Sequence, residues 1–166
     1  MPRCVVAHIV KTDPYEELVA GVYWLRHPPG ERHERICRKL HASVAAVLEA
    51  VSELQRLEVR ELIQLRPGIE VRPDLTLVER ETGQPWLVAE VVNRDDHRPD
   101  TVVKKAIYEE IQVPRLWMID PRYDNVEVYA RNEYGLALGR ILALRDVLDE
   151  PRLPGFNVSM EELFGG

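Results

Sequence analysis

Apolar side chains recur three or four positions apart between residues 31 and 54, a spacing that places them along one face of an α-helix. We predict a long amphipathic helix there. Upstream, Asp13, Pro14 and Glu16 have the order of an N-cap, a first-turn proline and a capping-box partner. This order predicts a short helix over residues 15–20 that ends at Gly21, with strands over residues 1–10 and 22–26 on either side of it.

The middle of the chain changes to the alternation and β-branched content that are typical of strands. Strands are expected over residues 57–65, 69–79 and 86–92, with a turn at Pro67 and Gly68 between the first two. Gly83 marks a hairpin between the last two, which makes them antiparallel neighbours. Because residues 75–78 and 87–92 are apolar on both faces, these strands should lie in the centre of a sheet covered on both sides.

The last third of the chain alternates between one more helix and several strands. The helix is expected over residues 101–112 with Asp100 as its N-cap, and the strands over residues 115–120, 125–131 and 136–144. Ser159 and Glu162 have capping-box spacing at a last helical turn. The whole order predicts an α/β fold with a central sheet flanked by helices.

Length and composition are those of one globular domain, with 166 residues of which 45% are hydrophobic and 30% charged, so we expect residues 1–166 to form a single domain. Cys4 and Cys37 have neither disulfide-framework nor zinc-ribbon spacing, and the N-terminal apolar run is too short for a signal segment or a membrane span. We therefore expect a cytoplasmic protein that does not enter a membrane. The net charge of −6 argues against non-specific coating of long polyanions but permits a local basic groove.

Glu90 lies inside the apolar run LVAEVV, where a buried carboxylate needs a cation, a proton or hydrogen-bond donors beside it. Asp74 begins the preceding strand, and the Gly83 hairpin brings the two acids side by side. Both could then hold one Mg²⁺ or Mn²⁺ ion together with water and substrate phosphate. The alternative is structural: Asp74 caps a turn after Pro73, and Glu90 pairs with a lysine or arginine.

Lys104 follows Glu90 by one loop and one helical turn and could reach back over the strand ends. Asp100 and Tyr108 lie one turn before and after it on the same helix face. An ammonium group in that place could orient or polarise an attacking water and offset charge on a phosphate. The alternative is a surface lysine that pairs with Asp100.

Other catalytic and binding patterns are missing from the sequence. The five histidines form no metal-ligand pair, and His33 fits a structural residue at the start of the long helix. There is no glycine-rich phosphate loop, which disfavours nucleotide-binding enzymes. Trp24, Trp86 and Trp117 fit a core or a dimer interface better than a base-stacking platform.

Four segments carry a resemblance to a known family: PDL at residues 73–75, LVAEVV at 87–92, the spacing D-x-x-x-K-x-x-x-Y at 100–108, and VPRLWMIDP at 113–121. HERI at 33–36 and LPGFNVSMEELF at 153–164 extend it. They resemble the Uma-type "putative restriction endonuclease" family of the PD-(D/E)XK nuclease superfamily. The resemblance implies a restriction-endonuclease-like fold, with a mixed central sheet flanked by helices.

The resemblance also implies roles for single residues. Asp74 and Glu90 would be the metal-binding carboxylates, and the backbone carbonyl of Val91 a further ligand. Lys104 would be the catalytic lysine, moved onto the helix from its usual place two residues after the second acid, which is Val92 here. An acidic residue of the first long helix can also join the site in this superfamily, and Glu34 is the candidate here. Apart from the resemblance, His33 at the helix start and Asp100 and Tyr108 on the helix face of Lys104 are further candidates for accessory residues.

We therefore predict a metal-dependent endonuclease that hydrolyses phosphodiester bonds in nucleic acid, in DNA more than in RNA, with Mg²⁺ or Mn²⁺ as the cofactor. Because a domain of this size offers limited area to a duplex, we expect a homodimer with a shared groove. The alternative is a binding or regulatory module that keeps the nuclease fold but does not cut, which the net negative charge favours.

Overall fold

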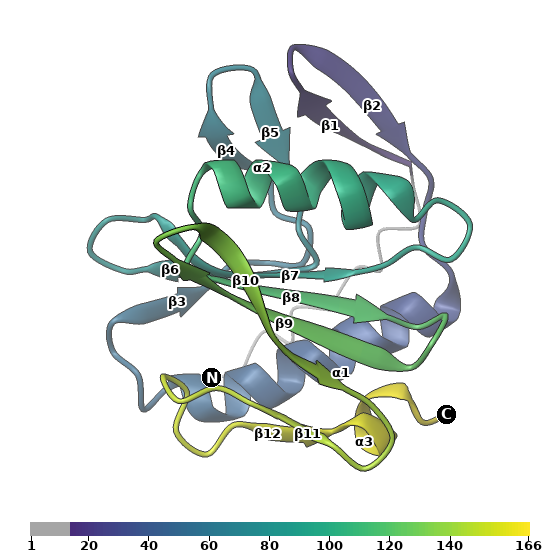
Figure 1. The fold of residues 1–166 in the computed structure, drawn as a ribbon, viewed down its shortest axis with the longest axis vertical. Helices are drawn as coiled ribbons and strands as arrows, with labels where there is room; N and C mark the ends of the chain where they lie inside the picture. The colour runs from purple at the N-terminus through teal and green to yellow at the C-terminus, as the bar shows by residue number, and fades with distance from the viewer. Residues whose placement is uncertain (1–13) are drawn as a thin grey trace, which may run out of the picture.

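The computed structural model describes residues 14–166 and contains a six-stranded mixed sheet with helices on both faces (Figure 1). The strand order is β10-β9-β8-β7-β6-β3. Only β7 and β8 run parallel, while the other neighbours are antiparallel. The strands are β3 (Leu54–Arg56), β6 (Leu75–Glu79), β7 (Pro85–Val91), β8 (Arg115–Asp120), β9 (Asn125–Asn132) and β10 (Gly135–Leu142). This arrangement is the mixed central sheet that the sequence predicts.

One face of the large sheet packs against α1 (Glu31–Leu48) and the C-terminal segment. That segment consists of β11 (Val147–Asp149), β12 (Asn157–Ser159) and α3 (Met160–Phe164). Trp117 on this face stacks on Phe156, with ring centroids 5.4 Å apart. Buried side chains such as Ile36, Leu40, Leu75, Leu87 and Trp117 make this the larger of the two cores in the described chain.

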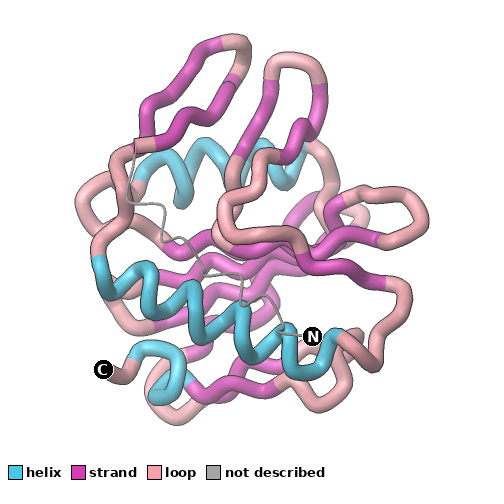
Figure 2. The backbone as a smooth tube through the Cα atoms, turned by 180° about the vertical axis from the view of Figure 1, so that it is seen from behind, coloured by secondary structure: helices cyan, strands magenta, loops and turns pink. Residues whose placement is uncertain are grey.

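The opposite face carries a π-helical turn η1 (Pro99–Lys104), the helix α2 (Lys105–Glu110) and a second sheet of order β2-β1-β5-β4. The second sheet is formed by two hairpins, β1 (Tyr15–Val19) with β2 (Val22–Arg26), and β4 (Ile63–Arg66) with β5 (Ile69–Val71). Figure 2 shows the hairpins side by side, beyond the large sheet. The second core lies between these layers and includes Val71, Val88, Tyr108, Leu116 and Met118.

The predicted helix over residues 15–20 is wrong, because the segment forms the strand β1. Ala20 and Gly21 have φ values of 51° and 77° and make the two-residue turn that joins β1 to β2. A two-residue hairpin turn needs positive φ at its central positions, so the glycine that reads as a helix end is a turn residue. In this strand the Glu17 side chain points inward, and only 1% of the surface of Glu17 is exposed.

Three further predicted elements differ in their bounds from the observed ones. The long helix ends at Leu48, although the helical spacing of apolar residues continues to Leu54. The residues after Leu48 form turns, in one of which the Val51 N–H donates to Leu48 O. Val51 and Leu54 are still buried, which accounts for the continued spacing. The predicted strand over residues 69–79 divides into β5 and β6, which belong to different sheets, on either side of Pro73. A proline has no N–H for a strand ladder, which favours the break. The predicted strand over residues 57–65 begins only at Ile63.

Asp100 is not the N-cap of the second helix. The N-cap position is Arg98, without a side-chain cap, and Asp100 lies inside η1 with its carboxylate bound to Arg26. The capping box of Ser159 and Glu162 is confirmed, as are β8, the β9–β10 pairing and the hairpin at Gly83.

The expected strand over residues 1–10, the Asp13 cap, and Cys4 and His8 fall outside the described residues. No helix within residues 14–166 has both the length and the apolar character that crossing a membrane requires.

Candidate active site

The two acids of the predicted site meet where β6 begins and β7 ends. Leu75 pairs with Ala89 in the antiparallel register, so the preceding Asp74 and the following Glu90 fall opposite one another. The Val91 N–H donates to Asp74 Oδ2 at 2.9 Å, which ties the strands together at this point. Both acids are buried, with 4% of Asp74 and 1% of Glu90 exposed.

Lys104 reaches back from η1 onto Glu90. Its Nζ lies 2.6 Å from Glu90 Oε1 and 2.8 Å from Glu17 Oε1, while Asp100 Oδ1 is 3.7 Å away. The Tyr108 hydroxyl donates to the same Glu90 oxygen at 2.5 Å. Because only 1% of Lys104 is exposed, the alternative of a surface lysine is wrong.

The β1–β2 hairpin adds two residues that the sequence reasoning missed, Glu17 and Arg26. Arg26 donates to Glu17 Oε2 at 2.9 Å and to both oxygens of Asp100 at 3.1 Å. The Arg72 N–H donates to Glu17 Oε1 at 2.7 Å. The buried ion network therefore runs from the hairpin through η1 to the end of β7. No alternation of apolar and polar residues marks 15–19 as a strand, and the apparent capping box pointed to a helix.

On the α1 side, Asp74 is held by His33 and by Arg60, a further residue that was missed. His33 Nε2 lies 2.8 Å from Val91 O and 3.3 Å from Asp74 Oδ2. Arg60 donates to Asp74 Oδ1 at 3.1 Å, and its other terminal nitrogen lies 2.6 Å from Glu34 Oε1. Arg60 comes from the loop between β3 and β4, with a positive φ of 53°, which no pattern in the sequence marks.

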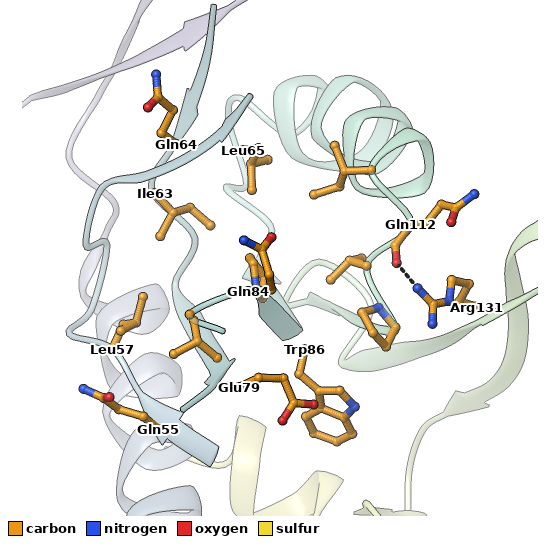
Figure 3. A pocket seen from close by; sticks show the side chains of 16 residues that line it. Gln55, Leu57, Ile63, Gln64, Leu65, Glu79, Gln84, Trp86, Gln112 and Arg131 are labelled. Carbon is orange, nitrogen blue, oxygen red and sulfur yellow. Dashed lines mark hydrogen bonds between the residues drawn. The ribbon is translucent and has the colours of Figure 1, made fainter. Parts of the chain in front are cut away.

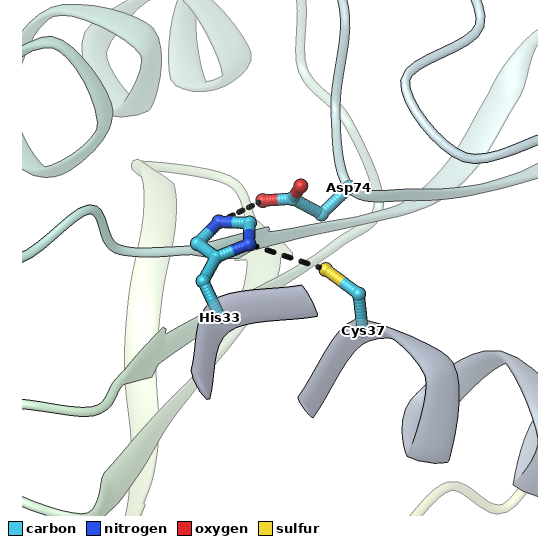
Figure 4. A group of neighbouring side chains, drawn as sticks. All are labelled: His33, Cys37 and Asp74. Atoms are coloured by element: carbon cyan, nitrogen blue, oxygen red, sulfur yellow. Dashed lines mark hydrogen bonds and ion pairs between the residues drawn. The ribbon is translucent and has the colours of Figure 1, made fainter. Parts of the chain in front are cut away.

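Figure 4 shows a chain of contacts from Asp74 through His33 to Cys37. Cys37 Sγ lies 3.7 Å from His33 Nδ1, and one donor atom from each of the three residues lies within 4.8 Å of the others. The order resembles the cysteine, histidine and acid of thiol hydrolases. However, burial and the nearby Asp74 raise the pKa of the Cys37 thiol well above its ordinary value, so it is not an activated nucleophile.

Negative charge exceeds positive charge at this site. Within residues 14–166, five buried carboxylates gather here and only three permanent cations accompany them: Glu17, Glu34, Asp74, Glu90 and Asp100 against Arg26, Arg60 and Lys104. With a neutral His33, the buried group lacks two positive charges. Two protons or one divalent cation would balance it.

The pKa shifts show where protons bind in the absence of a cation. Burial and the carboxylates of Asp100, Asp74 and Glu17 raise the pKa of Glu90 to about 8, although Lys104 opposes this. Burial lowers the pKa of His33, but Asp74 outweighs it and the net shift is upward. Burial would raise the pKa of Asp74, but His33, Arg60 and the Val91 N–H hold it below its ordinary value. Glu90 and His33 are therefore the groups that take up protons.

The Glu90 shift predicts how stability depends on pH. An unfolded glutamate has its pKa near 4.5 and the folded one near 8, so the stabilisation from the protonated acid is complete below pH 4.5 and is lost as the pH rises through 8. In EDTA, raising the pH from 5 to 9 should lower the melting temperature of the wild type by several degrees more than that of Glu90→Gln. Thermal unfolding of both proteins measures this, and parallel curves would contradict it.

The donor set suits a hard divalent cation. It offers the carboxylates of Asp74 and Glu90 and the carbonyl of Val91, all oxygen ligands. Oε1 of Glu90 accepts a hydrogen bond from the Tyr108 hydroxyl and forms an ion pair with Lys104 Nζ. Oε2 of Glu90 has no hydrogen bond to any residue of 14–166. The described structure thus brings together all of the residues that the sequence suggested. They are Asp74, Glu90, Val91, Lys104, Glu34, His33, Asp100 and Tyr108.

A cavity of about 660 Å³ lies at the other end of the central strands (Figure 3). Its lining includes Gln84 and Trp86 at the start of β7, and Gln112 and Arg131 beside the start of β8. None of the predicted site residues lines it. The charged site and this cavity are therefore separate features of the fold.

Comparisons with known proteins agree with the fold and with the predicted family. Residues 7–161 match the family described as "Putative restriction endonuclease" (Uma2). A similar solved structure is that of "a putative nuclease belonging to DUF820 from Anabaena variabilis ATCC 29413", with a TM-score of 0.75, 15% identity, and coverage of 92% of this chain and 91% of that one. At this identity the likeness concerns the fold, and it confirms the predicted fold class. No curated protein matches the sequence.

Proposed function

Because the chain belongs to the Uma2 family, described as "Putative restriction endonuclease", we propose that it is a metal-dependent nuclease that hydrolyses phosphodiester bonds. The observation that carries the proposal is the meeting of Asp74, Glu90 and Lys104 at the ends of β6 and β7, where Lys104 Nζ lies 2.6 Å from Glu90 Oε1. Two acids that can hold a divalent ion, with an amine beside them, are groups that can catalyse phosphodiester hydrolysis. A preference for DNA, a homodimer, a cytoplasmic location and a single domain remain predictions.

Asp74, Glu90 and the carbonyl of Val91 would hold Mg²⁺ or Mn²⁺. The deficit of two positive charges and the free Oε2 of Glu90 support this assignment. When bound, the ion supplies a Lewis acid and lowers the pKa of its water. Asp74 needs little adjustment, because its lowered pKa keeps it ionised at neutral pH.

Lys104 acts as a positive charge and a hydrogen-bond donor, not as a base. Burial lowers its pKa, but Glu17 and Glu90 outweigh this and raise it well above the ordinary value, so the ammonium keeps its proton. It can therefore orient a water and offset charge on the scissile phosphate. Glu17 is a positioning residue, because it would still hold Lys104 if the Glu90 carboxylate rotated to bind a metal ion.

The proposal is tested by incubating the purified protein with duplex DNA, single-stranded DNA and RNA in Mn²⁺, Mg²⁺ or EDTA. Asp74→Asn and Lys104→Met are purified and assayed in parallel. Metal-dependent products from the wild type alone support the proposal. Equal products from all three proteins would indicate a contaminating nuclease, and no product from any substrate would count against cleavage.

Metal binding should also release protons. At pH 7 Glu90 retains a proton that a divalent cation makes unnecessary, so we expect about one proton to leave per Mn²⁺ bound, and a further fraction from His33, whose pKa Asp74 raises. Titration calorimetry in buffers of different ionisation enthalpy measures this number. Glu90→Gln should release about one proton fewer, and a wild type that releases none would argue against charge compensation by the ion.

The second candidate is a nuclease-fold module that does not cut, and Arg60 favours it. Its guanidinium contacts both Asp74 and Glu34 and so already provides part of the charge that an ion would bring. Melting temperatures in increasing Mg²⁺ or Mn²⁺ separate the two candidates. If neither ion raises the melting temperature while Glu90→Gln does, the carboxylates are structural.

A further inference from the structure

We infer that His33, Cys37 and Asp74 form a second metal site, selective for a thiophilic ion such as Zn²⁺ and sharing Asp74 with the proposed nuclease site (Figure 4). His33 and Cys37 lie one turn apart on the same face of α1, and Asp74 approaches them from the start of β6. The three side chains therefore come from two elements that the core holds together.

The donor atoms lie close enough for tetrahedral coordination after small side-chain rotations. Zinc bonds of about 2.3 Å to sulfur and about 2.1 Å to nitrogen or oxygen place neighbouring ligand atoms about 3.4–3.6 Å apart. Cys37 Sγ lies 3.7 Å from His33 Nδ1, and Asp74 Oδ2 lies 3.3 Å from His33 Nε2. These two contacts use different ring nitrogens, and one ion binds only one of them. With a single donor atom from each residue the three atoms still lie within 4.8 Å of one another, so rotations of the side chains bring them to the tetrahedral spacing.

Arg60 does not block the binding of an ion at this cluster. Arg60 contacts Asp74 Oδ1, whereas the cluster uses Oδ2. The Cys37 thiol must lose its proton to solvent when the sulfur–metal bond forms, so the thiol becomes a thiolate and one proton is released. Where His33 is protonated, its ligating ring nitrogen releases a second proton to solvent. Thiolate and imidazole ligands favour Zn²⁺ or Co²⁺ over Mg²⁺, which distinguishes this site from the all-oxygen one.

A thiophilic ion at this cluster would compete for Asp74 with the ion of the nuclease site. This consequence rests on the proposed function, but the binding of the ion does not. The regulatory outcome is inhibition of Mn²⁺-dependent cleavage by Zn²⁺ through Cys37. Zn²⁺ should therefore inhibit the wild type more strongly than it inhibits Cys37→Ser.

Cobalt is the probe for binding, in a full-length Cys4→Ser background where Cys37 is the remaining thiol. We expect one equivalent of Co²⁺ to produce the near-ultraviolet absorption of a thiolate-to-cobalt charge transfer, and excess Zn²⁺ to abolish it. Cys37→Ser should remove the band, and Asp74→Asn should weaken Co²⁺ binding at least about tenfold. If saturating Co²⁺ gives no such band in the folded Cys4→Ser protein, the site does not exist, whatever the variants do.

Failure of the nuclease proposal is recognised separately. The cobalt titration contains no nucleic acid, so a protein without cleavage activity that shows the band still has the site. Conversely, cleavage that Zn²⁺ inhibits equally in the Cys4→Ser protein and the doubly substituted Cys4→Ser, Cys37→Ser protein would overturn the regulatory part, because the inhibition would not involve Cys37.

Discussion

Asp74→Asn and Lys104→Met should each reduce Mn²⁺-dependent cleavage by about 10³-fold or more, for different reasons. Asn at position 74 keeps the shape and loses the anionic ligand, so Mn²⁺ affinity should fall together with the rate. Met at position 104 removes the ammonium 2.6 Å from Glu90 but no proposed ligand, so the rate should fall while Mn²⁺ binding is retained or strengthened. Cleavage rates and calorimetric Mn²⁺ titrations of the same preparations measure both effects.

Lys105→Met is the matched control for this experiment. Lys105 is the next residue along the chain, and its ammonium lies over the Tyr129 ring at 4.6 Å, outside the site. Its substitution should leave the cleavage rate within about a factor of two or three, as is usual for positions away from the chemistry. If Lys104→Met cleaves as fast as Lys105→Met, Lys104 has no catalytic part, and the remaining role of the residue is structural.

Lys104→Met should also lower the free energy of unfolding by about 3–5 kcal/mol in EDTA, because it leaves Glu17 and Glu90 buried with one cation fewer. Urea unfolding followed by circular dichroism measures the loss. The variant should therefore be assayed for cleavage below its unfolding transition. Lys105→Met serves as the control again and should change stability by less than about 1 kcal/mol.

A compensating substitution tests the cause of this loss. Adding Glu17→Gln to Lys104→Met removes one of the two acids that the lost ammonium contacted, so part of the lost stability should return. Glu17→Gln alone should destabilise the protein, because Arg26 and Lys104 then lose an ionised partner. Strictly additive effects of the two substitutions would show that the residues do not interact energetically.

Local patterns were sufficient for the parts of the fold that depend on neighbours in sequence. The Gly83 hairpin placed Asp74 opposite Glu90, because a short connection between two strands fixes their pairing. The capping box of Ser159 and the bounds of β8 followed from local signals in the same way. The helix wrongly expected at residues 15–20 shows the weakness of this reasoning, since a terminating glycine and a turn glycine look alike in sequence.

The sequence by itself determined the family, the central strands and the acid and lysine positions, since each of these is recorded in a short run of residues. Only the tertiary structure decided how the buried charges are balanced. Glu17 meets Lys104 across 87 positions of chain, and Arg26 meets Asp100 across 74. No sequence periodicity extends over such separations. A carboxylate in an apolar run indicates only that a compensating partner is needed, and the tertiary packing decides which cation contacts it.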